Sequence, residues 1–163
     1  MKISDLRSKS VTDLINEQGA KYPQKITISD VCLAGGSRIS KKSVSNYGHF
    51  FCEYITGTYN SLIEIDGDVV DNGACYLRGR LTDMTTNRTI IDELTPLNLW
   101  LSPGYVPTKD HAYTTPIISV PLFNPLYLGY LFAINGDIQV EMQNDSTEDL
   151  EYDICFHGYR VAP

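Results

Sequence analysis

In this 163-residue chain, the apolar side chains follow a period of two from Lys25 onward, except over residues 97–128. The pattern is plainest in two closing sets: Ile138, Val140 and Met142, and then Leu150, Tyr152, Ile154 and Phe156. Successive side chains of a β-strand point to opposite faces, so a period of two indicates strands with one buried face. The polar link "QNDSTED" between the sets is typical of a turn. We therefore expect the two runs to pair as an antiparallel hairpin that ends the chain on a core strand.

Further strand-like stretches lie upstream and are separated by turn residues. They occupy residues 25–36, 47–57, 59–70, 73–83 and 84–94, the last being a turn followed by a return strand. They are rich in β-branched and aromatic residues, which suit a pleated, half-buried surface. Short strands between frequent turns predict a mainly-β fold, an antiparallel β-sandwich or jelly roll, which we assign to residues 25–163.

Residues 1–24 are expected to form a short N-terminal helical arm. Ser10 can cap its first turn, and Asp13 stands where a capping box has an acid. Gly19 is placed to end the helix, and Pro23 prevents it from resuming. Its apolar stripe consists of Val11, Leu14 and Ile15. So short a helix must pack on its own sheet or on a neighbouring subunit, and the break before the first strand favours the neighbour.

Prolines interrupt the alternation over residues 97–128. Because proline is excluded from central strands, we expect a long excursion followed by an edge strand at residues 116–128. Loops of this length are usually functional or contact a partner. The subunit-interface residues that we predict therefore come from the helix and this excursion: Val11, Leu14, Ile15, Trp100, Tyr105 and Tyr113.

Charge and hydropathy argue against several kinds of partner. The formal net charge is −7, and the basic run "SRISKKS" at residues 37–43 is best interpreted as a solvated loop. Proteins that bind duplex nucleic acid contact its phosphates first, so we expect no nucleic-acid partner. The most apolar stretch, residues 116–134, is broken by prolines and a glycine, so we expect no membrane span. The first residues lack the apolar core of a signal peptide, and we expect synthesis in the cytoplasm.

The four cysteines do not form a metal-binding pattern. Cys32, Cys52, Cys75 and Cys155 include no C-x₂-C pair, so a structural zinc site is not expected. Without export, disulfides are not expected either. Cys52 and Cys75 lie in strand-like runs, and we interpret them as small hydrophobic residues.

An acidic run offers a possible cation site. Glu64, Asp66 and Asp68 alternate along "EIDGD", and with Asp71 they could supply the carboxylate oxygens that Ca²⁺ prefers. The spacing does not match an EF-hand loop, and an acidic hairpin turn around Gly67 is the favoured interpretation.

The histidines show no catalytic pattern. His49, His111 and His157 lack zinc-helix spacing and have no nucleophile motif beside them. Cys155 and His157 share a strand face, but neighbours two apart on a strand rarely face each other as a dyad requires. We expect neither enzymatic activity nor a cofactor. Some of the eleven tyrosines and Trp100 could line a sugar-binding surface, although core or interface positions are favoured.

The last third of the chain resembles a terminal segment of small virion proteins from tailed bacteriophages. The resemblance lies in "PLFNP" at residues 121–125, "GDIQVEMQNDS" and "FHGYRV" at residues 156–161. Members of that family are typically built on a β-sandwich or jelly-roll scaffold, as structural components of capsid, neck or tail. The resemblance implies a non-enzymatic, homo-oligomeric structural subunit of the neck or tail ring region, in contact with neighbouring virion proteins. The alternatives are a carbohydrate- or receptor-binding module and a capsid-decorating protein.

Overall fold

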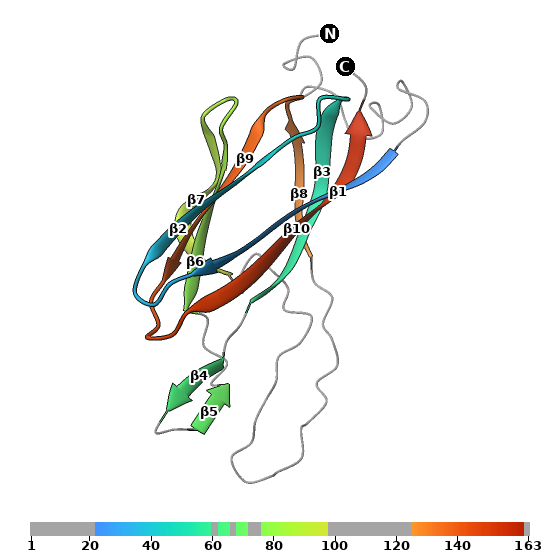
Figure 1. Ribbon diagram of the computed structural model, residues 1–163. Helices are drawn as coiled ribbons and strands as arrows, with labels where there is room; N and C mark the ends of the chain where they lie inside the picture. The colour runs from blue at the N-terminus through green and yellow to red at the C-terminus, as the bar shows by residue number, and fades with distance from the viewer. Residues whose placement is uncertain (1–21, 60–61, 66–67, 72–75, 98–124, 162–163) are drawn as a thin grey trace.

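The computed structural model describes residues 22–59, 62–65, 68–71, 76–97 and 125–161. They form two antiparallel four-stranded sheets and a separate two-stranded sheet, which confirms the mainly-β sandwich (Figure 1). The strands are β1 (Tyr22–Cys32), β2 (Ser37–Ser43), β3 (His49–Tyr59), β4 (Leu62–Ile65), β5 (Asp68–Asp71), β6 (Leu77–Asp83), β7 (Arg88–Pro96), β8 (Leu126–Phe132), β9 (Asp137–Asn144) and β10 (Leu150–Val161). No helix occurs among these residues, and the predicted helix at residues 10–19 lies outside them.

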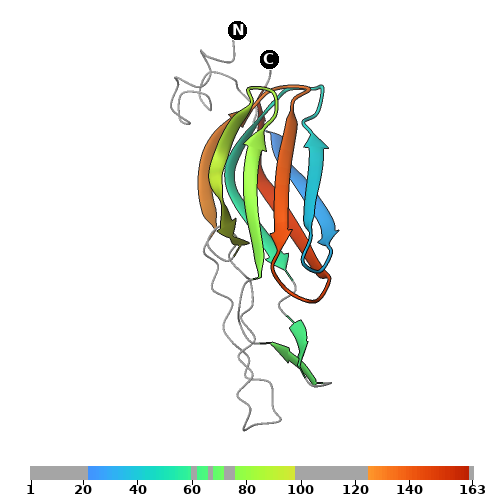
Figure 2. The same cartoon turned by 90° about the vertical axis from the view of Figure 1, so that its left-hand side faces the viewer.

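The strand order is that of one long hairpin rolled onto itself. One sheet has the order β1-β10-β3-β8 and the other β2-β9-β6-β7 (Figure 2 shows the second sheet in front). The first half of the chain pairs with the second in nested fashion: β1 with β10, β2 with β9, β3 with β8 and β6 with β7. The β6–β7 turn is the tip of this hairpin. This confirms the turn and return strand predicted at residues 84–94.

The prediction that the two closing strands pair with each other is wrong, but the prediction of which side chains they bury is confirmed. Strand β9 pairs with β2 and β6, whereas β10 pairs with β1 and β3, so the two strands lie in opposite sheets. The polar link carries the chain across the sandwich. The Asn144 amide nitrogen donates hydrogen bonds to the carbonyls of Cys32 (2.9 Å) and Glu148 (2.7 Å), and its oxygen accepts one from the Ser146 amide (2.9 Å). These bonds hold an inter-sheet crossing in place of a tight turn.

The core fills the space between the two sheets. Both closing apolar sets are buried in it as predicted, Ile138, Val140 and Met142 from β9 and Leu150, Tyr152, Ile154 and Phe156 from β10. The largest side chains are Phe50, Phe132 and Phe156, and the Phe132 ring is stacked on Phe50 and edge-on to Phe156. Burying a side chain of this size contributes about 1.5–3 kcal/mol, so this layer is the main source of stability.

Two other segments differ from their predicted structure. The basic run predicted as a solvated loop is the edge strand β2, although its side chains other than Ser40 are exposed. Lysines on an edge strand discourage pairing with another chain, which explains a basic run there. The stretch predicted as one strand over residues 59–70 is broken, because β4 and β5 form a hairpin with Ile65 opposite Asp68. This agrees with the favoured hairpin around Gly67.

The edge strand predicted at residues 116–128 can be compared with the structure only from residue 125 onward. Strand β8 begins at Leu126 and is an edge of its sheet, while residues 98–124 lie outside the described part. Strand β1 begins at Tyr22 and so takes in the last residues that we assigned to the N-terminal arm.

A bulge in β3 determines which of its side chains point to the outer face of the sheet. Glu53 has no partner on either side, because Cys52 pairs with Gly158 and Tyr130 while Tyr54 pairs with His157 and Tyr127. An extra residue of this kind lets the strand turn a side chain to the other face. Cys52 therefore points into the core and Tyr54 points outward, although the two are separated by one residue.

Candidate functional site

The two outer faces of the sandwich differ in chemistry. On the sheet β2-β9-β6-β7, outward charges pair with one another across strands. Arg80 Nη2 lies 2.7 Å from Glu141 Oε2, and Arg78 Nε lies 2.8 Å from Asp145 Oδ2. Paired surface charges keep much of their hydration and contribute little to binding or stability. This face has the character of a solvated surface.

The opposite outer face, on the sheet β1-β10-β3-β8, carries a transverse row of side chains in register. Lys25 is paired with His157, His157 with Tyr54, and Tyr54 with Tyr127. One residue from each of the four strands therefore stands side by side across the sheet. We call these four residues the central row.

The rings of the central row stand against one another. The Tyr54 and His157 rings are stacked, with centroids 4.7 Å apart and planes 12° apart. Adjacent strands are themselves about 4.8 Å apart, so the rings face one another along the sheet and do not lie flat on it. Tyr127 meets Tyr54 edge-on, with centroids 6.1 Å apart, and its side chain is 77% exposed. The result is an aromatic ridge that ends in an open tyrosine on the edge strand.

The His157 ring is held by side chains of the neighbouring strand β3. Its Nε2 lies 2.7 Å from Thr56 Oγ1, and burial followed by the charge of Lys25 lowers the pKa of the imidazole. Cys155 lies on the same face, but its Sγ accepts a weak hydrogen bond from the Thr27 hydroxyl at 3.6 Å. The two side chains thus have separate partners on opposite neighbouring strands, an arrangement that locks the ridge in place.

An open depression of about 160 Å³ lies beside the ridge, where the β3 bulge meets the start of β1. Its lining includes Lys25, Glu53, Tyr54, His157 and Tyr159. The Glu53 carboxylate is the main cause of a raised pKa of the Tyr159 phenol. One cation, one anion and three rings therefore surround a shallow, solvent-open hollow.

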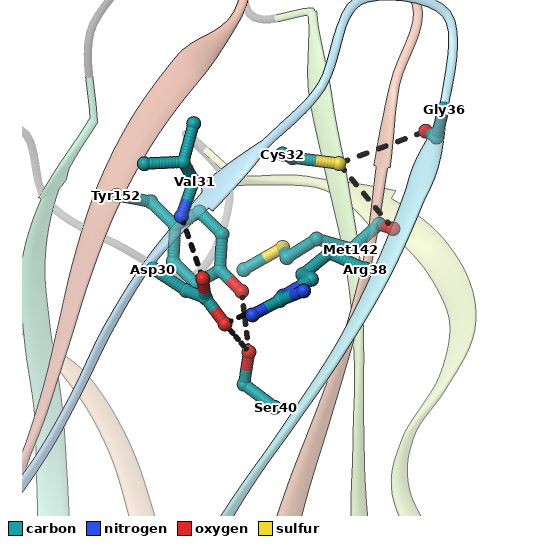
Figure 3. A network of polar contacts seen from close by, with 8 residues as sticks. All are labelled: Asp30, Val31, Cys32, Gly36, Arg38, Ser40, Met142 and Tyr152. Atoms are coloured by element: carbon teal, nitrogen blue, oxygen red, sulfur yellow. Dashed lines mark hydrogen bonds and ion pairs between the residues drawn. The ribbon is translucent and has the colours of Figure 1, made fainter.

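A polar network closes the β1/β2 side of the sandwich (Figure 3). Asp30 Oδ2 accepts hydrogen bonds from Ser40 Oγ (2.5 Å) and Arg38 Nε (2.8 Å), and the Val31 amide donates to Oδ1 (2.9 Å). The bond from Arg38 is the main reason that the pKa of Asp30 is lowered. Ser40 also lies 3.0 Å from the Tyr152 hydroxyl. These contacts join β1 and β10 of one sheet to β2 of the other, so we assign the network a structural role.

A second acid–tyrosine contact joins the sheets further across. The buried Asp83 carboxylate accepts hydrogen bonds from the Tyr130 hydroxyl (2.8 Å), the Thr86 hydroxyl (2.8 Å) and the Thr85 amide (3.0 Å). It fixes the β6–β7 turn and anchors the edge strand β8 to the opposite sheet. Arg88 lies over the Tyr130 ring at 5.8 Å.

The interface residues predicted from sequence lie outside the described part of the chain: Val11, Leu14, Ile15, Trp100, Tyr105 and Tyr113. His111, Cys75 and Asp66 lie outside it as well. Among the described residues, no group of three or more His, Cys, Asp or Glu side chains is placed to hold a metal ion.

The remaining predicted residues can be placed. Cys32 and Cys52 are free and buried, and burial raises the pKa of Cys52 to about 12. The place of Cys52 in the core between the sheets confirms it as a small hydrophobic residue. Cys155 is free and half-buried. His49 is buried, and its Nδ1 accepts a hydrogen bond from the Ile134 amide at 3.1 Å.

The sequence predicts a strand at Tyr54. It does not identify Tyr54, Tyr127 or Lys25 as members of a surface site. The aromatic density of the segment "YGHFFCEYITG" was the available signal.

Comparison with known proteins identifies no relative of this chain. No protein-family model matches the chain, and no curated protein or solved structure matches it. The part of the chain that the structure describes contains no helix long and apolar enough to cross a membrane.

Proposed function

We propose that this chain is a non-enzymatic structural subunit that assembles through the outer face of the sheet β1-β10-β3-β8. The observation that carries the proposal is the contrast between the two outer faces. One carries two ion pairs, Arg80 with Glu141 and Arg78 with Asp145, and the other presents the central row with its exposed Tyr127. Protein interfaces are enriched in tyrosine and depleted in charge at their centres.

The ring geometry favours a protein partner over a sugar. A sugar ring packs on an aromatic face that is open to solvent. One face of Tyr54 is covered by His157, and Tyr127 meets the same ring edge-on. A ridge of upright rings instead offers edges and one terminal side chain, which fit into a pocket or between the side chains of another protein surface.

The placement in a tailed-bacteriophage particle rests on the resemblance of the last third of the chain. The motif "FHGYRV" is the end of β10, and it contributes His157 to the central row and Tyr159 to the depression. Strand order supports the jelly-roll form of the sandwich: leaving out the β4–β5 hairpin, eight strands pair as one rolled-up hairpin. We place the subunit in the neck or tail ring region, as a homo-oligomer in contact with other virion proteins. A capsid-decorating position is the alternative within the particle.

The experiment that tests assembly is a concentration series by sedimentation velocity. Tyr127→Ala removes the exposed end of the ridge without touching the core, so it should weaken self-association about tenfold or more, the loss typical of a central interface tyrosine. Thr82→Ala, on the opposite outer face, is the matched control and should associate like the parent protein. Equal association of all three proteins would contradict the proposed face.

A second candidate, binding of a carbohydrate or receptor, draws on one observation. The depression combines Lys25, Glu53 and Tyr159, which can donate and accept hydrogen bonds around a small polar ligand. A glycan panel screened against the parent protein and Glu53→Ala tests this candidate. Binding that Glu53→Ala abolishes would favour it over assembly.

A further inference from the structure

Two more rows of side chains cross the outer face of the sheet β1-β10-β3-β8 beside the central row. Residues two positions apart on a strand point to the same face, so each step of two along β10 gives a further row. The first, which we call the neutral row, consists of Thr27, Cys155 and Thr56. The second, which we call the acidic row, consists of Ser29, Asp153 and Thr58. The neutral row thus lies midway between the central row and the acidic row.

The charges on this face are separated along the strands. Lys25 in the central row is exposed, as are Asp153 in the acidic row and Glu151 one step beyond it. Within the described ranges, no ion pair holds Lys25, Asp153 or Glu151. Glu53, which lines the depression together with Lys25, interacts with the Tyr159 phenol. Opposite charges therefore stand on either side of the neutral row without ion-pair partners in the described part of their own chain.

The rows also differ in height. Tyr54 and His157 stand upright as stacked rings, so the central row is a ridge. The neutral and acidic rows carry only short side chains, none longer than that of aspartate. A second copy turned end for end would present its low acidic row to this ridge, and its own ridge to the acidic row here. The face is therefore complementary to itself in both shape and charge.

We propose that two copies of this chain meet through this face with their strands running in opposite directions, about a two-fold axis that follows the neutral row. The inference rests on the proposed function and identifies the partner at the same face as a second copy. The central row of each copy then lies over the acidic row of the other. Lys25 lies about 5 Å, one strand spacing, to the side of Asp153 in the second copy, which its long side chain can span.

The other two-fold arrangement of the same face is disfavoured by charge. If the axis ran along the strands, each row would lie over the same row of the second copy. Asp153 would then stand beside Asp153 of the second copy, and the two ridges would meet tip to tip. Like charges placed together across an interface oppose association. Only the axis along the neutral row brings opposite charges together and fits each ridge to a low surface.

The proposed contact limits how a larger assembly is built. A two-fold contact uses the same surface on both copies, so it is closed once two copies have met. Each contact between Lys25 and Asp153 occurs twice in the dimer. Any ring of this subunit would therefore have the dimer as its building block and use a second surface to link the dimers.

Charge reversal tests the arrangement in the full-length protein, by sedimentation velocity over a concentration series. Lys25→Glu places two acids together at both contacts, and Asp153→Lys places two lysines together. Each variant alone should dimerise about tenfold more weakly than the parent protein. An equimolar mixture of the two variants should associate like the parent, because both contacts of the mixed dimer pair opposite charges. Lys41→Glu, on the edge strand β2 of the other sheet, changes the net charge as Lys25→Glu does and should associate like the parent.

A thiol cross-link gives a second measurement that does not depend on charge. Cys155 lies on the proposed axis and so faces Cys155 of the second copy. Packed sheets are about 10 Å apart, which is too far for a disulfide but within reach of a bis-maleimide of similar length. The parent should give a covalent dimer, and Cys155→Ser should not. Equal yields from the two proteins would contradict the position of the axis, and this result decides the case if a charge variant does not fold.

The outcomes distinguish this inference from the proposed function. Suppose that both charge variants weaken association but their mixture does not restore it, or that neither differs from the parent while Tyr127→Ala does. The face then mediates assembly in another arrangement, and the two-fold contact is refuted. If Tyr127→Ala and both charge variants all associate like the parent, the proposed face itself is wrong. A parent that stays monomeric at every concentration would contradict both and would mean that the face binds a different molecule.

Discussion

The hydroxyl of Ser40 lies 3.0 Å from the hydroxyl of Tyr152 and joins the two sheets of the sandwich. Ser40 belongs to β2 and donates its proton to Asp30 on β1, so the Tyr152 hydroxyl on β10 is the donor in this pair. A tyrosine that fills the core with its ring thus ends in a chain of hydrogen bonds that leads to a carboxylate. The network closes one side of the sandwich without burying an unpaired charge.

Removal of the two ends of this network should have unequal effects on stability. Tyr152→Phe keeps the buried ring and loses one hydrogen bond, so the free energy of unfolding should fall by about 1 kcal/mol. Asp30→Ala removes the acceptor for Ser40, Arg38 and the Val31 amide, and the loss should be clearly larger. Urea unfolding of both variants measures the difference. A loss for Asp30→Ala no greater than for Tyr152→Phe would mean that the carboxylate is not the centre of the network.

Stability should fall on mild acidification because of the buried histidine. Burial lowers the pKa of His49, so the folded state favours the neutral ring, whose Nδ1 accepts the Ile134 amide. Above the ordinary histidine pKa of about 6.5 both states are neutral and the stability is fully present. Below it the unfolded state binds the proton first, and stability falls by at most about 1.4 kcal/mol per pH unit per histidine until the folded pKa is reached.

The control for this pH dependence is His49→Gln. It keeps a hydrogen-bond acceptor and removes the titration, so its melting temperature should decline less between pH 7.5 and pH 5.5, both values chosen about one unit from the unperturbed pKa. His157, whose pKa is also lowered by burial, should account for part of the decline that is left. An identical decline in the parent and the variant would show that His49 is not a source of the acid sensitivity.

Gly158 should tolerate no side chain. A Cβ there would collide with the carbonyl oxygen of Phe51 and lie 2.8 Å from its carbonyl carbon, where backbone rather than a movable side chain is in the way. Gly158→Ala should therefore destabilise the protein by about 3 kcal/mol or more, at the upper end for an overpacked site. Gly35→Ala, in open space at φ +61°, should cost only about 1 kcal/mol. Similar thermal melts for the two variants would contradict the close approach of β10 and β3.

Ile154→Asp should abolish soluble folding. Ile154 is fully buried between the sheets on β10, and a carboxylate there has no partner. Thr27→Asp, at an exposed position of the paired strand β1, should remain soluble and fold. Expression and thermal melting of the two variants give the comparison, and a cooperatively melting Ile154→Asp protein would refute the inward orientation.

The alternating pattern identified the buried faces of β9 and β10 but not which strands are neighbours. Ile138 and Ile154 occupy the positions that their phase predicts, yet their strands lie in different sheets. A period of two determines which face a residue occupies, whereas pairing depends on contacts between residues far apart in sequence. The residue types of the polar link are those of a turn, and Asn144 and Ser146 do form turn-like hydrogen bonds within it. The link nevertheless crosses between the sheets.

The candidate site was less predictable than the fold. Uninterrupted alternation would place Cys52 and Tyr54 on the same face, and the bulge at Glu53 separates them. No residue type near Glu53 predicts that bulge. The central row also depends on the register of four strands, of which only β1 and β10 lie near the ends of the chain. The Asp30 network could not be predicted from the sequence, because the interpretation of "SRISKKS" as a loop gives Ser40 no inward position.

The claim that the aromatic face mediates assembly is tested most directly by tyrosine modification in the free and the assembled protein. Tyr127 and Tyr47 are 77% and 71% exposed, so they should react at similar rates in the dilute subunit. Tyr127 ends the central row, whereas Tyr47 lies in the turn between β2 and β3 and serves as an internal control. Assembly through this face should protect Tyr127 and leave Tyr47 reactive. A Tyr127 that reacts as fast in the assembly as in the free subunit would contradict the proposed interface.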